Sequence, residues 1–247
     1  MRARRLSWRA AVRLAAPIPS LIAPAFALCQ EAVWFPTADG GRVHADLYGE
    51  GERAVLLAHG GRFDRTSWAD QAPVIAAAGF RVLAIDFRGR GESVGGPEWA
   101  GSDEGYVTDV RAAIDYLRAS AATSVSIVGA SFGGWAAARA AVEAGPGEID
   151  ALVLLAHSPI ERPEDLSGRK LFITARDDPY ADGSPRLADI RDQYERAPEP
   201  RELVILDGEA HAQHIFDTPQ GGRLLDEILR FLAGAAELDS IRPPDGR

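Results

Sequence analysis

The stretch from Ser124 to Trp135 constrains the fold more than any other part of the chain, because a buried-strand pattern runs directly into a glycine-rich turn. It reads Ser-Val-Ser-Ile-Val-Gly-Ala-Ser-Phe-Gly-Gly-Trp and continues into an alanine-rich segment. The apolar, β-branched run predicts a strand, and the alanine-rich segment predicts a helix. Gly129 and Gly133 flank Ser131 at a spacing of two residues, where a Cβ atom would collide with the strand and the helix. The sequence therefore predicts a strand, a very tight turn at Ser131 and then a helix.

The predicted turn would push the hydroxyl of Ser131 out of the sheet at the start of a helix. Negative charge that develops at a helix N-terminus is stabilised by free backbone N–H groups and by the helix dipole. This placement suits a nucleophile, but a serine at the same position can also simply cap the helix. The remainder of the sequence has to distinguish the two interpretations.

Length and charge narrow the class of protein. The 247 residues are enough for one large α/β domain with a substantial core. Residues 1–29 contain five arginines and no acidic residue, so the remaining 22 basic and 36 acidic residues give a net charge of −14. A surface this acidic repels phosphate backbones, and we therefore expect no nucleic-acid partner.

The first 29 residues resemble a targeting segment more than part of the fold. Basic residues precede an apolar stretch that ends Ala25-Phe26-Ala27, which is the pattern of a secretory signal peptide. Three prolines interrupt the apolar stretch, so a disordered basic leader is the alternative. We expect an exported protein if the segment is a signal peptide and a cytoplasmic one otherwise. Residues 30–235 are then one domain without a membrane-spanning helix, and residues 236–247 a disordered tail. A single cysteine, Cys29, excludes an internal disulfide.

Strand and helix patterns alternate along the domain. A hairpin comes first, and the later strands are short, continuous apolar runs of the kind buried on both faces of a parallel sheet. The eight predicted strands cover residues 32–37, 42–48, 53–59, 80–86, 124–128, 151–156, 170–175 and 202–207. Helices are predicted at residues 67–78 and 106–120, from the serine turn to about residue 144, at 185–196 and from about 218 to 232. The pattern indicates a doubly wound, mostly parallel α/β sheet with helices on both faces, which places ligand sites at the carboxyl ends of the strands.

Two of those predicted strand ends carry the groups that a nucleophilic serine requires. Free serine is a weak nucleophile and needs a base to accept its proton and a carboxylate to orient that base. The strand ending at Ala175 is followed by Arg-Asp-Asp-Pro-Tyr, and the strand ending at Leu206 by Asp-Gly-Glu-Ala-His-Ala-Gln-His. The chain order is therefore serine, aspartate, histidine, which resembles the α/β-hydrolase family.

The resemblance extends from about Val33 to Leu232 and includes two further motifs. His59-Gly60-Gly61 resembles the family's oxyanion loop, and the segment from Asp86 to Ser93 resembles its D-x-R-G-x-G-x-S turn. The resemblance implies an α/β-hydrolase fold with a serine nucleophile and no cofactor. The resemblance also implies an oxyanion hole formed by the backbone N–H group of Phe132 and that of Gly61, with Arg62 as the alternative to Gly61. We also expect no metal, because no His, Cys and carboxylate residues have metal-ligand spacing in the sequence.

Each triad loop offers two candidates. Family loops place the acid three residues after a small residue that ends the strand and just before a proline, which selects Asp178 over Asp177. The family's G-x-x-H pattern selects His211 over His214, which we expect at the start of the last helix and bordering the site. The resemblance therefore implies a catalytic triad of Ser131, Asp178 and His211.

The connection between the sixth and seventh strands is too short for the cap domain that many α/β-hydrolases carry there. Only about thirteen residues, 157–169, separate the two strands. An open pocket follows, with Arg62, Phe63 and Tyr180 as expected substrate contacts. The chain is thus similar to the lidless dienelactone-hydrolase-like and small-esterase branch, which implies a small-molecule ester substrate. A peptidase, a thioesterase, an acyltransferase or a non-hydrolytic binding or sensor protein on the same scaffold remain alternatives.

Overall fold

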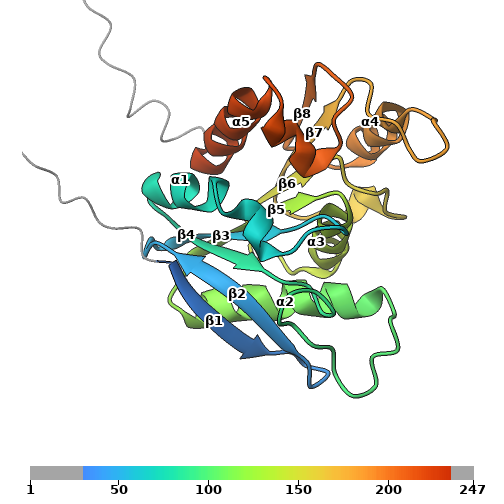
Figure 1. Ribbon diagram of the computed structural model, residues 1–247. Helices are drawn as coiled ribbons and strands as arrows, with labels where there is room; N and C mark the ends of the chain where they lie inside the picture. The colour runs from blue at the N-terminus through green and yellow to red at the C-terminus, as the bar shows by residue number, and fades with distance from the viewer. Residues whose placement is uncertain (1–29, 235–247) are drawn as a thin grey trace, which may run out of the picture.

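The computed structural model describes residues 30–234, in which eight strands form one mixed sheet (Figure 1). The strand order is β1-β2-β4-β3-β5-β6-β7-β8. The pairs β1–β2 and β2–β4 are antiparallel, and all other neighbouring pairs are parallel. This is the predicted α/β-hydrolase arrangement, and it confirms the fold class. The predicted leader and tail lie outside the described residues.

The described elements follow the predicted alternation. The strands are β1 (Gln30–Pro36), β2 (Arg42–Tyr48), β3 (Arg53–Ala58), β4 (Phe80–Ile85), β5 (Ser124–Ala130), β6 (Ala151–Leu155), β7 (Arg169–Ala175) and β8 (Arg201–Leu206). The α-helices are α1 (Gln71–Ala77), α2 (Glu104–Ala119), α3 (Phe132–Glu143), α4 (Arg186–Arg196) and α5 (Gly221–Ala233). Three short 3₁₀ helices are η1 (Arg65–Trp68), η2 (Pro163–Asp165) and η3 (Ala212–Asp217).

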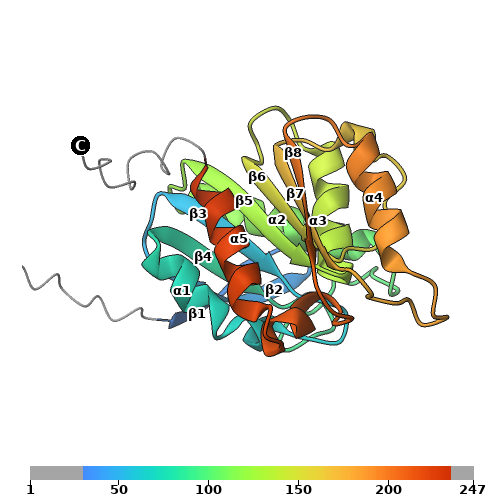
Figure 2. The ribbon, with the colours of Figure 1, turned by 90° about the horizontal axis from the view of Figure 1, so that it is seen from above.

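The central strands are buried on both faces, because each face of the sheet is covered by helices. In β3, Leu56 and Ala58 pack into the cluster that contains residues of α2, α3 and α4. The alternating residues Val55 and Leu57 pack into the opposite cluster, with residues of α1 and α5. Figure 2 shows α1 and α5 together on one side of the sheet and α3 and α4 on the other. Continuous apolar runs, rather than an apolar and polar alternation, are what a strand between two such layers requires.

The helix predicted over residues 67–78 is divided into two, and this part of the prediction is wrong. Asp64 begins η1 by accepting a hydrogen bond from Thr66 N–H at 2.9 Å, and α1 begins only at Gln71. Pro73 has no backbone N–H and cannot donate an α-helical hydrogen bond to the turn before it. It is tolerated within the first turn of a helix, where no such bond is needed. The last helix likewise begins three residues later than predicted, at Gly221.

The sheet carries no cap domain. Residues 156–168 connect β6 to β7 and contain only the single turn η2. The carboxyl ends of β3, β5, β7 and β8 are therefore not covered by an additional domain in the described part of the chain.

Within residues 30–234, none of the helices has both the length and the apolar character needed to cross a bilayer.

Candidate active site

Ser131 lies at the turn between β5 and α3, as predicted. Its φ of 51° and ψ of −116° are unusual for a residue with a side chain. Such a conformation costs on the order of 1–3 kcal/mol and persists only where surrounding contacts enforce it. Here the N–H of Ser131 donates to the carbonyl of Leu155 at 2.8 Å, and its carbonyl accepts from Trp135 at 3.1 Å. The turn is thus held by the neighbouring strand on one side and by its own helix on the other.

Two glycines permit this turn by allowing backbones to approach closely. A Cβ atom on Gly129 would lie 2.6 Å from the Cα of Gly134 in α3. A Cβ atom on Gly133 would lie 2.4 Å from the carbonyl oxygen of Ala58 at the end of β3. Both distances are far below van der Waals contact, so the start of α3 can reach the sheet only where these side chains are absent. This is the packing that the G-x-S-x-G spacing predicts.

Three side chains from three strand ends form one continuous line of hydrogen bonds. His211 follows β8, and its Nε2 lies 2.7 Å from the Oγ of Ser131. Its Nδ1 lies 2.7 Å from the Oδ2 of Asp178, which follows β7. With the proton on Nδ1, the ring donates to the carboxylate and accepts from the hydroxyl. The structure therefore brings together all three residues that the sequence assigned to a triad.

The alternative members of each loop lie elsewhere. Asp177 is exposed, and its N–H donates to the carbonyl of Gly208 at 2.9 Å. His214 lies in η3, where its ring centroid is 5.1 Å from that of Phe63 and its side chain is 57% exposed. It was expected at the start of the last helix, and it instead borders the site from a 3₁₀ turn before that helix.

Asp178 has a second partner that the sequence analysis missed. The side chain of Asp178 is fully buried, and its Oδ2 lies 3.1 Å from the Nε of Arg186 at the start of α4. A buried carboxylate is costly unless it is paired, and Arg186 provides a positive charge at the same oxygen that faces His211. No motif marks Arg186 in the sequence, because the contact depends on how α4 packs against the end of β7.

Tyr180 packs against this pair and not against the serine. Its ring lies under the guanidinium of Arg186, 4.0 Å from the ring centroid, and its hydroxyl donates to Asp189 at 2.7 Å. Burial, together with this hydrogen bond, raises the pKa of Tyr180 to about 12. Tyr180 therefore helps to hold the loop that carries Asp178.

The predicted oxyanion loop, residues 59–61, lies beside Ser131 and Phe132. A Cβ atom on Gly60 would lie 3.5 Å from the Cβ of Ser131, and one on Gly61 would lie 3.6 Å from the Cβ of Phe132. The N–H of Gly60 already donates to the side chain of Gln213 at 2.7 Å. The backbone of Gly61 is therefore the part of this loop that lies next to the start of α3.

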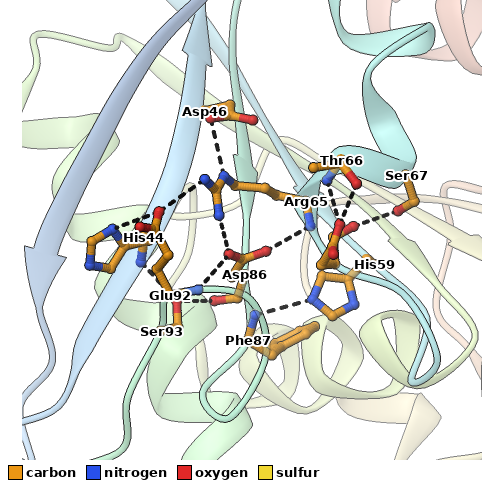
Figure 3. Close-up of polar contacts among 11 residues, drawn as sticks. His44, Asp46, His59, Arg65, Thr66, Ser67, Asp86, Phe87, Glu92 and Ser93 are labelled. Atoms are coloured by element: carbon orange, nitrogen blue, oxygen red, sulfur yellow. Dashed lines mark hydrogen bonds and ion pairs between the residues drawn. The ribbon is translucent and has the colours of Figure 1, made fainter.

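His59 fixes the loop through its ring. Its Nε2 accepts a hydrogen bond from Phe87 N–H at 3.2 Å (Figure 3). Its Nδ1 lies 2.8 Å from the carbonyl of Gly60. Both contacts are satisfied when the proton is on Nδ1 and the ring is neutral. Burial lowers the pKa of His59, which favours the neutral ring.

A partly buried ionic cluster anchors the residues that follow the loop. Arg65 pairs with the carboxylate of Asp86 and lies 3.1 Å from both Asp46 and Glu92 (Figure 3). The backbone N–H of Arg65 also donates to Asp86 at 2.7 Å. Burial alone would lower the pKa of Arg65, but the charges and hydrogen bonds of the two aspartates raise it. Asp86, fully buried at the end of β4, therefore has a structural role in joining the oxyanion loop to the D-x-R-G-x-G-x-S turn.

Arg62 and Phe63 line a surface groove of about 400 Å³ next to the oxyanion loop. Gln213 and Phe216 of η3 also line it. Acidic side chains of Asp64, Asp70 and Asp217 also line it. Two of the three predicted substrate contacts thus share one groove, whereas Tyr180 does not line it. Within residues 30–234 the structure contains no group of three or more His, Cys, Asp or Glu side chains arranged to hold a metal ion.

Comparisons with known proteins agree with this fold. Residues 49–176 match the family described as serine aminopeptidase, S33. The non-heme chloroperoxidase CPO-A1 of Kitasatospora aureofaciens is 33% identical over 124 residues, which are 50% of this chain and 43% of that protein. The chain therefore spans less than half of that relative.

Solved structures give the same result for the fold. An esterase of Pyrococcus furiosus superposes with a TM-score of 0.68 at 18% identity, covering 83% of this chain and 92% of the other. A dienelactone hydrolase of Anabaena variabilis superposes with a TM-score of 0.64 at 22% identity, covering 81% and 95%. Because the family match covers slightly more than half of the 247 residues and the fold agrees with it, this protein belongs to the serine aminopeptidase S33 family of the α/β-hydrolases.

Proposed function

We propose that this protein is a serine hydrolase that cleaves carboxylic ester bonds of small or accessible substrates. The observation that carries the proposal is the line of hydrogen bonds from Ser131 through His211 to Asp178, with both distances at 2.7 Å. A nucleophile within hydrogen-bond reach of a base, which is itself oriented by a carboxylate, is the arrangement that activates a serine hydroxyl. The fold and family membership agree with a hydrolase.

In the proposed mechanism, Nε2 of His211 removes the proton of Ser131 as the hydroxyl attacks the substrate carbonyl. Asp178 stabilises the imidazolium that forms, and His211 then donates the proton to the departing alcohol. An acyl-enzyme is left on Ser131. A water molecule, deprotonated by the same histidine, attacks the acyl group and releases the acid.

The negative charge of the tetrahedral intermediate needs donors that are already in place. The backbone N–H groups of Gly61 and Phe132 are the proposed donors, since the two residues lie side by side and Phe132 is the first residue of α3. One such donor typically contributes about 3–4 kcal/mol to transition-state stabilisation. The groove lined by Arg62 and Phe63 is the proposed site for part of the substrate.

The proposal predicts that purified protein hydrolyses p-nitrophenyl acetate and butyrate, and that Ser131→Ala abolishes this activity. Ser120→Ala is the matched control, because Ser120 lies at the end of α2 and its hydroxyl donates to the carbonyl of Tyr116 in the same helix. A fluorophosphonate probe should label the peptide that contains Ser131 in the wild type and in the control. Equal turnover by the wild type and by Ser131→Ala would contradict the proposal.

The two neighbouring aspartates provide a second matched pair. Asp178→Asn should lower kcat by about ten-thousand-fold, because the amide favours the wrong imidazole tautomer. Asp177→Asn should leave kcat within about twofold, since Asp177 is exposed and its side chain does not contact His211. The reverse ranking would reassign the acid. Parallel assays with thioester and aminoacyl-anilide substrates would show which acyl bond is preferred.

A further inference from the structure

Gln213 connects two parts of the site that come from opposite ends of the sequence. It lies two residues after His211, within η3, and is 5% exposed. Its Oε1 accepts the N–H of Gly60 at 2.7 Å, and its Nε2 donates to the Oγ of Ser67 at 2.7 Å. One side chain therefore spans from the histidine loop to the oxyanion loop and to η1.

Gly60 is held on both its N–H and its carbonyl side by hydrogen bonds within the protein. The carbonyl of Gly60 is held in turn by Phe63 N–H at 3.0 Å and lies 2.8 Å from the Nδ1 of His59. The peptide groups on both sides of Gly60 are thus fixed, one of them by Gln213. Because the N–H of Gly60 is used within the protein, the next amide, that of Gly61, is left for a ligand beside Phe132.

The amide of Gln213 is itself held in orientation. The hydroxyl of Ser67 accepts from Nε2 of Gln213 and donates to the carbonyl of Asp64 at 2.6 Å. A reversed amide would place its NH₂ group against the N–H of Gly60 and its oxygen against a hydroxyl whose proton is already used. These contacts assign the oxygen of Gln213 to Gly60.

Backbone geometry allows His211 and Gln213 to serve different partners. Ala212, between them, has a φ of 49° although it carries a Cβ atom, and it is buried. The left-handed conformation is strained for alanine, so it persists only because the contacts on both sides require it. His211 contacts Ser131 and Asp178, while Gln213 contacts the oxyanion loop.

We propose that Gln213 is a positioning residue that sets the distance between the oxyanion loop and the base His211. This role rests on the proposed function of Ser131. Gln213 touches neither the substrate carbonyl nor the serine, and it acts through the backbone of Gly60. Because displacement of about 1 Å can cost a large factor in rate, losing this contact should lower kcat more than it changes KM.

The test compares Gln213→Met with Gln193→Met. Gln193 is also buried and also bridges two segments, through hydrogen bonds to the N–H and carbonyl of Ile160, but it lies in α4. Both variants lose two hydrogen bonds and retain similar side-chain volume, so their loss of stability should be similar. Gln213→Met should lower kcat for p-nitrophenyl acetate by about tenfold to a hundredfold with KM within about twofold, whereas Gln193→Met should retain its kcat.

Hydrogen exchange of the Gly60 amide provides a measurement that does not depend on turnover. Its exchange should accelerate in Gln213→Met and remain slow in Gln193→Met. Ser67→Ala, a mild change, should have a smaller effect on kcat in the same direction because the amide of Gln213 loses its orienting partner. Faster exchange at Gly60 with an unchanged kcat would overturn the positioning role. An unlabelled wild-type protein in the fluorophosphonate assay would instead refute the proposed function, and unchanged exchange at Gly60 would separately refute the contact.

Discussion

Acidification should destabilise this protein through His157, which is buried at the end of β6. The side chain is fully buried, packs against Phe172 with ring centroids 5.6 Å apart, and has no hydrogen-bond partner for either nitrogen among the described residues. Burial, and next the positive charge of Arg186, lower the pKa of His157 from 6.5 to about 3. The folded protein therefore keeps a neutral ring under conditions in which the unfolded chain binds a proton.

The sign and size of the effect follow from this difference in pKa. Between about pH 6.5 and pH 3 the unfolded state binds more protons, so stability falls as the pH falls. At about 1.4 kcal/mol per pH unit, the free energy of unfolding should decrease by about 2 kcal/mol between pH 7.5 and pH 5, and by about 5 kcal/mol at pH 3 and below. A loss of 2 kcal/mol is a large part of the 5–15 kcal/mol typical of a folded domain.

The assay is urea unfolding followed by tryptophan fluorescence at about pH 7.5, 6 and 5. In His157→Leu the decrease between pH 7.5 and pH 5 should be about 2 kcal/mol smaller than in the wild type, because the titrating group is gone. His214→Leu is the matched control and should behave as the wild type, since the side chain of His214 is mostly exposed. Equal pH dependence in the wild type and in His157→Leu would refute the reasoning.

Three other changes have defined outcomes. Gly133→Ala should lower the free energy of unfolding by about 2–3 kcal/mol in a urea titration, because the new Cβ would lie 2.4 Å from a carbonyl oxygen of β3. Unchanged stability would contradict the close packing of α3. Arg65→Met leaves the buried Asp86 without its charged partner and should cost about 3–5 kcal/mol, whereas Arg111→Met, which breaks an exposed ion pair, should cost under about 1 kcal/mol. If residues 1–29 are a signal peptide, N-terminal sequencing of exported protein should begin near residue 28–30, and an intact leader on all of the protein would contradict export.

The parts of the fold that were predictable from the sequence are those governed by local patterns. Buried strands are continuous apolar runs, and glycines two residues on either side of Ser131 mark a turn in which no Cβ fits. Because the polar residues of the candidate site follow strand ends, their order along the chain indicated one shared site, and the family's loop patterns selected Asp178 and His211 as the partners of Ser131.

The parts that could not be predicted depend on contacts between distant segments. Arg186 reaches Asp178 only because α4 packs at the end of β7, and Gln213 meets Gly60 across 153 positions of sequence. Tyr180 was expected as a substrate contact in an open pocket, but its ring packs against the guanidinium of Arg186. The break between η1 and α1 was also missed, because the prediction of one helix took no account of the cap at Asp64 or of Pro73 near the start of α1.

The short connection between β6 and β7 has a consequence for how this scaffold can accommodate additional segments. Gln193 holds the connection at Ile160, and the next two residues, Glu161 and Arg162, are exposed. The entropy of closing a loop grows only with the logarithm of its length, so an insertion of about thirty residues after Ile160 would cost about 1 kcal/mol. A lengthened connection at this point would leave the strand register and the hydrogen bonds of Gln193 in place. One insertion can thus add a surface segment beside the later turns of α3 and α4, without any change to the residues that form the line of hydrogen bonds from Ser131 to Asp178.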